Sequence, residues 1–497
     1  MPHGQPDPNL PSSSLPRVLG PTEAYCVVVG SVIGSGIFLV PASVATNVPF
    51  LGGILLVWLL GGLLSAAGAL TLAELGAMMP HAGGPYVYLR AAYGRLPAYL
   101  FGWTEFTVAR AGSMATLAAA FARYFVQLAR APAGIHPQVW QSVVAVLAIA
   151  VVTMVNVLGT KRGGTLQVFG TVLKVGGVLG LMTLPFLLGG GQSSNLTPLV
   201  PGAGQRAIFT GMLAAMVSVL WAYDGWVNIT PLAEEIRDPS RSIPRALVLG
   251  MATLILVYTG MTLAYHYVLP MEDVIGANRL HEGTEQAVAA VYCNRLLGTN
   301  GVIAISLLVM CSTFISLNGN ALSGPRAYFA MARDGLLPRA LGQIHARYRT
   351  PANAVRAQGL WAVVLTIAAT ALIVFPPPVK TAGFFSPLWT AWKTLNSTPL
   401  YDLLLTYVIF GTTVFNLLTV GSVFVLRYRQ PEIPRPYRTW GYPWTPALFV
   451  MAALLLLGNM LIDDQSQVQS VAGLGLILLG VPASWLLRHR DRRSPGG

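Results

Sequence analysis

Stretches of about twenty apolar residues recur along the whole chain, and they restrict the fold more than any other feature. An α-helix of about 20 residues rises about 30 Å, which is the thickness of the hydrocarbon core of a bilayer. Hydrophobic residues make up 54% of the 497 and charged residues only 10%, so the chain cannot hide its apolar surface in a soluble core. The apolar runs cover residues 24–43, 54–79, 97–121, 138–158, 165–187, 207–223, 245–269, 300–324, 357–375, 401–426, 443–461 and 468–487. They predict an all-α integral membrane protein with twelve transmembrane helices.

The distribution of basic residues predicts the topology, because cytoplasmic loops carry an excess of Lys and Arg. With a cytoplasmic N-terminus, 22 of the 31 Lys and Arg residues fall on the cytoplasmic side and 7 on the opposite side. The remaining 2, Arg110 and Lys174, fall within spans. We therefore expect a multi-pass protein of the plasma (inner) membrane with both termini in the cytoplasm.

The net charge of +13 follows from the same loops. Basic loops attract anionic lipid, and no soluble segment is long enough for a separate nucleic-acid-binding domain, so we expect no nucleic-acid partner. The cysteines, Cys26, Cys293 and Cys311, lack the spacing of metal ligands, and we expect neither a metal nor a cofactor. We divide the chain into a disordered tail (1–20), a core of ten spans (21–427), two further spans (428–488) and a basic tail (489–497).

Two of the predicted spans contain residues that interrupt helices. The first span contains "GSVIGSGIFLV" at 30–40, and the sixth ends in "WAYDGWVNITPLAEEI" at 221–236. Broken spans at corresponding positions of two halves are the best sequence indication of a transporter binding site. We therefore expect a five-plus-five inverted repeat with discontinuous spans 1 and 6, plus two additional helices. The alternative for Gly30, Gly34 and Gly36 is a face of small residues that packs against another helix.

The chemistry of a broken helix suggests the kind of ligand. Half-helix N-termini attract an anion such as a carboxylate, and exposed carbonyl groups attract a cation such as an ammonium. Gly34 and Gly36 let a ligand approach the backbone without a β-carbon in the way. An amino acid carries both charges within a few ångströms and therefore fits such a site.

Six motifs, in order along the chain, resemble the amino acid–polyamine–organocation superfamily, and most closely its L-type amino acid transporter branch. They are "GSVIGSGIF", "LTLAELGAMMPHAGGPYVYL", "WAYDGWVNITPLAEEIRDPSRSIPRA", "SGPRAYFAMARDGLLP", "RTPANA" and "RPYRTWGYP". The resemblance covers about 18–488 and implies ten core helices plus two, with alternating access for amino acids. It further implies that Ile33, Gly34, Ser35 and Gly36 meet the substrate carboxylate. The amino group would meet the backbone carbonyls of Trp221, Ala222 and Tyr223, close to Gly225, with the Trp221 ring as an inner gate.

Lys174 lies near the middle of its span, where a lysine costs about 2.5–3.5 kcal/mol on insertion scales. The resemblance implies that it occupies the place where sodium-coupled relatives bind their ion, and hence sodium independence. It also implies that Tyr265 approaches this lysine. The alternatives are a structural salt bridge or a side chain that reaches the membrane surface.

Several other polar residues have more than one explanation. Asp224, at the break of span six, can contact an amine, carry a proton or stabilise a turn. We expect Arg110 to line the outer vestibule, although it could instead pair with Asp224 or a substrate carboxylate. For His266 we expect a satisfied core histidine. For Glu74, Glu234 and Glu235 we expect surface ion pairs rather than gating pairs, and residues 376–400 form a long outer loop of unassigned role.

The loop after the third span has no cysteine, so we expect no disulfide-linked heavy subunit, which the animal L-type transporters have. Val227 stands where an asparagine is common in the family, and Trp221 stands where a phenylalanine is frequent. Both differences affect the pocket for the substrate side chain and therefore the range of substrates. The histidines are scattered without a catalytic motif, and we do not expect an enzyme. We favour sodium-independent exchange of neutral L-amino acids. The alternatives are proton-coupled symport of neutral or cationic amino acids or polyamines and, more remotely, an amino acid sensor without transport.

Overall fold

The computed structural model describes residues 14–129, 131–202, 208–277, 287–374, 400–462 and 467–485. Residues 376–399 of the predicted outer loop, residues 1–13 of the N-terminal tail and the whole tail at 489–497 lie outside these described residues. Within them the regular secondary structure is helical, apart from a single isolated bridge between Leu19 and Ile236. The predicted all-α class is therefore confirmed.

The first half of the chain contains these helices: α1 (Pro21–Val32), α2 (Gly36–Asn47), α3 (Leu51–Met78), α4 (Pro85–Tyr93), α5 (Arg95–Thr104), the π-helical turn η1 (Glu105–Ala109), α6 (Arg110–Leu128), α7 (Pro137–Val157), α8 (Thr160–Leu188), η2 (Ser193–Leu196), α9 (Ile208–Ala222) and the 3-10 helix η3 (Trp226–Glu235). The second half contains α10 (Pro239–Val268), α11 (Met271–Gly276), α12 (Val288–Leu297), α13 (Thr299–Ser323), α14 (Pro325–Arg333), η4 (Arg339–Gly342), α15 (Ala352–Val374), α17 (Leu400–Arg429), α18 (Trp444–Ile462) and α19 (Gln467–Leu478).

Nine helices in the described ranges are long and apolar enough to cross a bilayer, and the bent pair α1–α2 can count as a tenth. The predicted third span consists of α5, η1 and α6 in direct succession, so that a π-helical turn divides it. The predicted twelfth span contains a shorter apolar helix, Ser470–Trp485. The count of twelve spans thus remains a prediction, as does the division into domains.

Both predicted breaks are confirmed. The first lies between α1 and α2, whose axes differ by 41°, and the second lies between α9 and η3. Each break contains a glycine, and Gly225 in the second has φ of +121°, a conformation that residues with a side chain rarely adopt.

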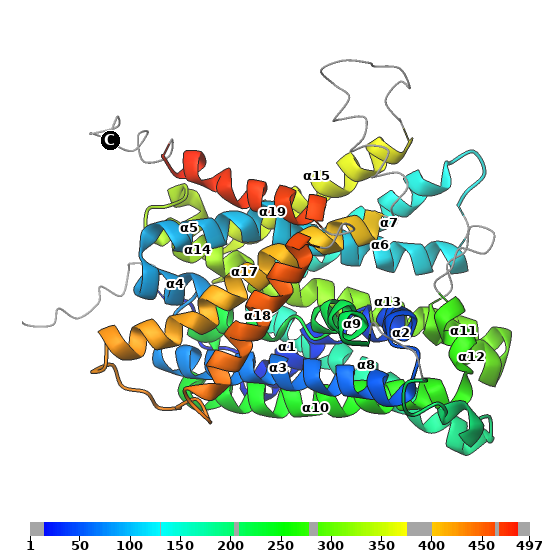
Figure 1. The fold of residues 1–497 in the computed structure, drawn as a ribbon. Helices are drawn as coiled ribbons and strands as arrows, with labels where there is room; N and C mark the ends of the chain where they lie inside the picture. Colours follow the sequence, from blue (N-terminus) through cyan, green and yellow to red (C-terminus); the bar gives the residue numbers. More distant parts are fainter. Residues whose placement is uncertain are drawn as a thin grey trace, which may run out of the picture.

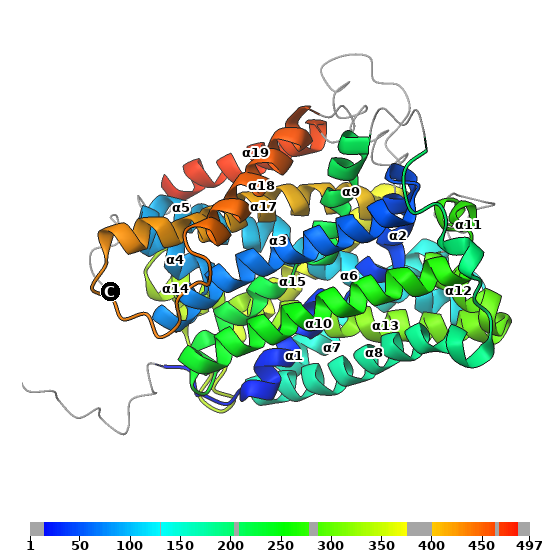
Figure 2. The same cartoon turned by 60° about the horizontal axis from the view of Figure 1, so that its bottom comes forward.

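The packing of the helices brings the two breaks together. Helices α3, α10 and α8 run side by side with α1 among them, and α2 packs along α9 (Figures 1 and 2). Helix α13 contacts α1, α6 and α8, while α18 lies against α3 and α17. The broken spans are thereby enclosed by spans from both halves of the chain.

Candidate functional site

The first break exposes the start of α2. α1 ends at Val32 and α2 begins at Gly36, and the amide of Gly34 donates to the Val32 carbonyl at 2.7 Å in a tight turn. Gly34, Ser35 and Gly36 line a cavity between the two breaks. The N-terminus of a helix carries unpaired N–H groups and a partial positive charge. This part of the cavity is therefore suited to a carboxylate.

The second break lies directly against the first. A Cβ built on Gly225 would lie 3.1 Å from the carbonyl carbon and oxygen of Ser31, and one on Gly36 would lie 2.8 Å from Cβ of Ala222. On Gly30 it would overlap Thr171 of α8, whereas on Gly34 its nearest neighbour would be 3.5 Å away. Close packing between helices thus accounts for Gly30 and Gly36, while a β-carbon at Gly34 would be in ordinary van der Waals contact.

Lys174 is fully buried behind the first break. Its ammonium group lies 2.5 Å from the carbonyl oxygens of both Gly30 and Ile33, 3.3 Å from that of Ser312 and 3.2 Å from Ser316 Oγ. None of the described residues forms a salt bridge with it, and it does not reach the surface, so both alternative explanations are wrong. The Lys174 ammonium is thus surrounded by four oxygens at the end of α1.

Tyr258, which sequence analysis did not select, connects the two breaks. Its hydroxyl lies 3.0 Å from the Val32 carbonyl and 3.1 Å from the Ala222 carbonyl, and its one hydrogen can be donated to only one of them at a time. Tyr265 does not bond with Lys174; its ring packs on Tyr292, and its buried hydroxyl has no hydrogen-bond partner among the described residues. The predicted approach of Tyr265 to Lys174 stays a prediction.

The other predicted substrate residues divide into two groups. Trp221, Ala222 and Gly225 line the cavity, together with Asp224. Tyr223 is buried and turned away from it, with its ring 6.0 Å from Trp58 and 4.9 Å from Tyr258 between ring centroids. The carbonyl of Ile33 bonds with Lys174, and the residue is not among those that line the cavity.

Arg110 lies in the wall of the cavity between the two breaks. Its guanidinium donates to the carboxylate of Glu105, to Asn228 Oδ1 of η3 and, at 3.0 Å, to Asn320 Oδ1 of α13. Glu105 is buried and was missed by sequence analysis, although an acidic and a basic residue in one apolar run are a recognisable signal. The positive charge of Arg110 is thus neutralised within the protein.

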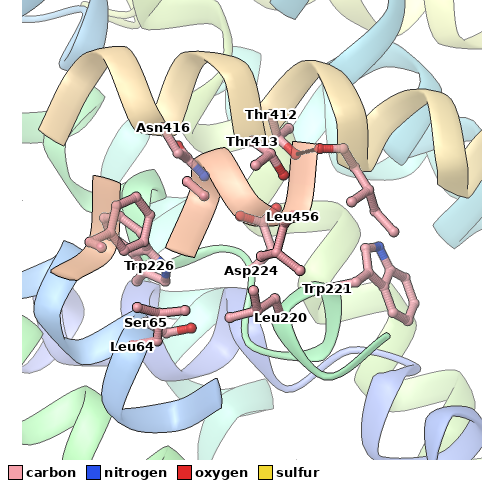
Figure 3. Close-up of a pocket in the computed structure, with 13 residues that line it drawn as sticks. Leu64, Ser65, Leu220, Trp221, Asp224, Trp226, Thr412, Thr413, Asn416 and Leu456 are labelled. Carbon is pink, nitrogen blue, oxygen red and sulfur yellow. Dashed lines mark hydrogen bonds between the residues drawn. The ribbon is translucent and has the colours of Figure 1, made fainter. Parts of the chain in front are cut away.

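A second cavity lies on the other side of Asp224 (Figure 3). It shares Trp221, Asp224 and Thr412 with the first cavity, so these residues separate the two. Its remaining walls come from α3, α17 and α18, with Leu220 of α9 and Trp226 of η3. Asp224 forms no salt bridge with any other described residue and borders both cavities.

A second group of polar contacts lies near the start of α1. Glu235 and Arg326 form a fully buried ion pair at 2.8 Å, and Thr160 bonds with both partners. Leu19, just before α1, donates its amide to the Glu235 carbonyl. The expectation of a surface pair is wrong for Glu235, because the long-range packing of three spans encloses it.

Glu74 is also buried rather than exposed. Its carboxylate accepts two hydrogen bonds from Arg427, at 2.8 and 2.6 Å, and two from the amide and hydroxyl of Thr439. Glu234 agrees better with the expectation, since its partner Arg333 is 40% exposed. His266 is buried, but neither ring nitrogen has a hydrogen-bond partner among the described residues, so it is not a satisfied core histidine.

Comparison with known proteins agrees with this architecture. A family model described as amino acid permease matches residues 19–481. The human cystine/glutamate transporter is 28% identical over 490 residues, which cover 98% of this chain and 88% of the relative. The serine/threonine exchanger SteT of Bacillus subtilis is 29% identical, covering 96% of this chain and 98% of the relative. The human b(0,+)-type amino acid transporter 1 is 30% identical, covering 86% and 79%. These matches confirm the resemblance to the L-type branch, and the chain belongs to the amino acid permease family.

Proposed function

We propose that this protein is a sodium-independent secondary transporter that exchanges amino acids across the membrane by alternating access. The observation that carries the proposal is the Lys174 ammonium among the oxygens of Gly30, Ile33, Ser312 and Ser316. A positive charge at this position would perform the structural task of a bound sodium ion. The names of the relatives, which include a serine/threonine exchanger, support exchange as the mode of transport.

In this proposal the two breaks bind the parts common to all amino acids. The start of α2 at Gly34, Ser35 and Gly36 receives the carboxylate, since helix N-termini attract anions. Backbone carbonyls at Trp221 and Ala222 receive the amino group, and the Trp221 ring covers the substrate. Movement of the broken spans relative to α6 and α13 then changes the side from which the cavity is reached.

The substrate class depends on Asp224. Neutral amino acids need only the two breaks, and they remain our first expectation. Because Asp224 borders the cavity and forms no salt bridge with another described residue, while Arg110 is paired with Glu105, the geometry also favours cationic amino acids. Electrostatic complementarity between the cavity and a cationic side chain would stabilise such a substrate.

The orientation and assembly belong to the same proposal. The excess of Lys and Arg in the loops supports cytoplasmic termini in the plasma membrane. The loop between α6 and α7 contains no cysteine, so we propose that the protein acts without a disulfide-linked heavy subunit.

Uptake of a panel of radiolabelled amino acids into proteoliposomes tests the substrate class, with Asp224→Asn as the variant. We expect uptake of neutral amino acids to change less than threefold and uptake of cationic ones to fall by about tenfold or more, because the variant keeps the shape of the side chain and removes only its charge. An equal loss for neutral and cationic substrates would contradict a role for Asp224 in selecting charge.

A further inference from the structure

We propose that α18, a helix outside the ten predicted core spans, forms the far wall of a pocket for the end of the substrate side chain. The ligand class is amino acids with an extended side chain that ends in a hydrogen-bond donor, such as ornithine or lysine. The proposal rests on the proposed function and names a further binding site for it. The site is the second cavity, beyond Asp224 (Figure 3).

The position of this cavity follows from the residues that it shares with the first. Trp221, Asp224 and Thr412 border both cavities, and Figure 3 shows all three around the second one. A substrate held at the two breaks therefore has this cavity directly behind the partition. Since we assign Trp221 as the gate over the substrate, its movement would join the two cavities.

The walls have the chemistry expected for an extended side chain with a polar end. Leu64, Leu220 and Leu456 supply apolar surface for a methylene chain. Ser65 and Thr413 supply hydroxyl oxygens, and Asn416, whose side chain hydrogen-bonds with Asp224, supplies an amide oxygen; Figure 3 shows Asn416 above and Ser65 below Asp224. A terminal ammonium needs such acceptors when it leaves water. Asp224 supplies the compensating charge.

Helix α18 contributes its inward face to this pocket. Phe449 and Ala453 line the cavity and are 8% and 4% exposed, whereas Leu454, the next residue, is 56% exposed. The Phe449 ring packs edge-on against Trp226 of η3, with ring centroids 6.0 Å apart, so the helix is fixed against the inner half of span six. α18 therefore separates the pocket from the surface that Leu454 faces.

The test fills the pocket from α18 without touching the residues at the breaks. The variant is Ala453→Phe, and the matched control is Leu454→Phe, which places the same ring on the exposed face of the same helix. KM for exchange is measured in proteoliposomes with alanine, 2,4-diaminobutyrate, ornithine, lysine and norleucine. Exclusion of one methylene from an apolar pocket is worth about 10- to 200-fold.

We expect Ala453→Phe to raise KM for lysine and norleucine by about tenfold or more, with alanine changed less than twofold and the control unchanged. Leu456→Ala, which enlarges the same pocket, should shift preference in the opposite direction, toward lysine over 2,4-diaminobutyrate. It also keeps the proposal testable if the phenylalanine variant does not fold. An equal change for alanine and lysine, or no dependence on side-chain length in either variant, would overturn the pocket while leaving the proposed function intact. Absence of uptake of every amino acid by the unaltered protein would overturn both.

Discussion

Replacement of Lys174 by methionine tests the reasoning behind the site most severely. Methionine has nearly the shape of lysine but cannot donate a hydrogen bond, so the carbonyls of Gly30 and Ile33 lose their charged partner. Ser316 Oγ lies 3.2 Å from both of these carbonyls and Ser312 Oγ lies 2.9 Å from that of Ile33, so two hydroxyls remain as donors, but neither carries a charge. The last turn of α1 would then relax, and the start of α2 would lose its fixed position at the cavity.

The size of the effect follows from the loss of these two charged hydrogen bonds. Hydrogen bonds to a charged group contribute about 1.5–3 kcal/mol each, which gives about 3–6 kcal/mol for the pair. Methionine also removes the cost of burying an ammonium, which opposes this loss. A net loss of about 3 kcal/mol corresponds to about a hundredfold weaker binding or slower exchange.

The assay is exchange of a radiolabelled amino acid by purified protein in sodium-free proteoliposomes. Lys161→Met serves as the control, because Lys161 lies on the same helix and is exposed at its start. The control should retain exchange within about twofold, and Lys174→Met should remain monodisperse in detergent. Exchange by Lys174→Met at more than about a third of the unaltered rate would refute the role of the ammonium in holding the break.

Two further variants test other contacts of the site. Tyr258→Phe leaves one buried carbonyl without its donor, at a cost of about 1–3 kcal/mol, so exchange should slow by about tenfold. The control Tyr265→Phe removes a hydroxyl that has no partner among the described residues, and it should leave the exchange rate unchanged. Equal rates for the two variants would contradict the role of the Tyr258 hydroxyl in connecting the two breaks. Glu235→Ala leaves a buried guanidinium unpaired and should cost about 3–5 kcal/mol of stability, seen as a large fall in the midpoint of thermal unfolding. Glu234→Ala breaks the more exposed pair with Arg333 and should lower the unfolding midpoint much less. Similar falls in the midpoint for the two variants would contradict the argument from burial.

The sequence predicted the features that depend on neighbouring residues along the chain. The break at 33–35 follows from glycines and serines inside an apolar run, and the break at 223–225 from Asp224 and Gly225. Lys174 could be placed near the middle of a span by counting residues along that span.

Contacts between distant residues could not be predicted in the same way. The partner of Glu74 is Arg427, 353 positions away, and nothing near either residue indicates the other. Glu105 and Arg110 are five positions apart, which an ideal α-helix places on different sides. The π-helical turn between them, in which the Arg110 amide donates to the Glu105 carbonyl, brings the two side chains together.

The choice between two tyrosines shows a similar limit. Tyr258 and Tyr265 are seven positions apart on α10 and thus on the same side of the helix. Only the depth at which the two breaks cross α10 decides which hydroxyl reaches their carbonyls. That depth depends on how α1, α9 and α10 pack, which no single stretch of sequence contains.

The most direct test of the account compares uptake into empty proteoliposomes with uptake into vesicles preloaded with unlabelled amino acid, without sodium on either side. The account predicts rapid uptake into preloaded vesicles, little into empty ones, and no increase when sodium is added. Sodium-dependent uptake would contradict the role proposed for Lys174, and proton-driven uptake into empty vesicles would contradict exchange.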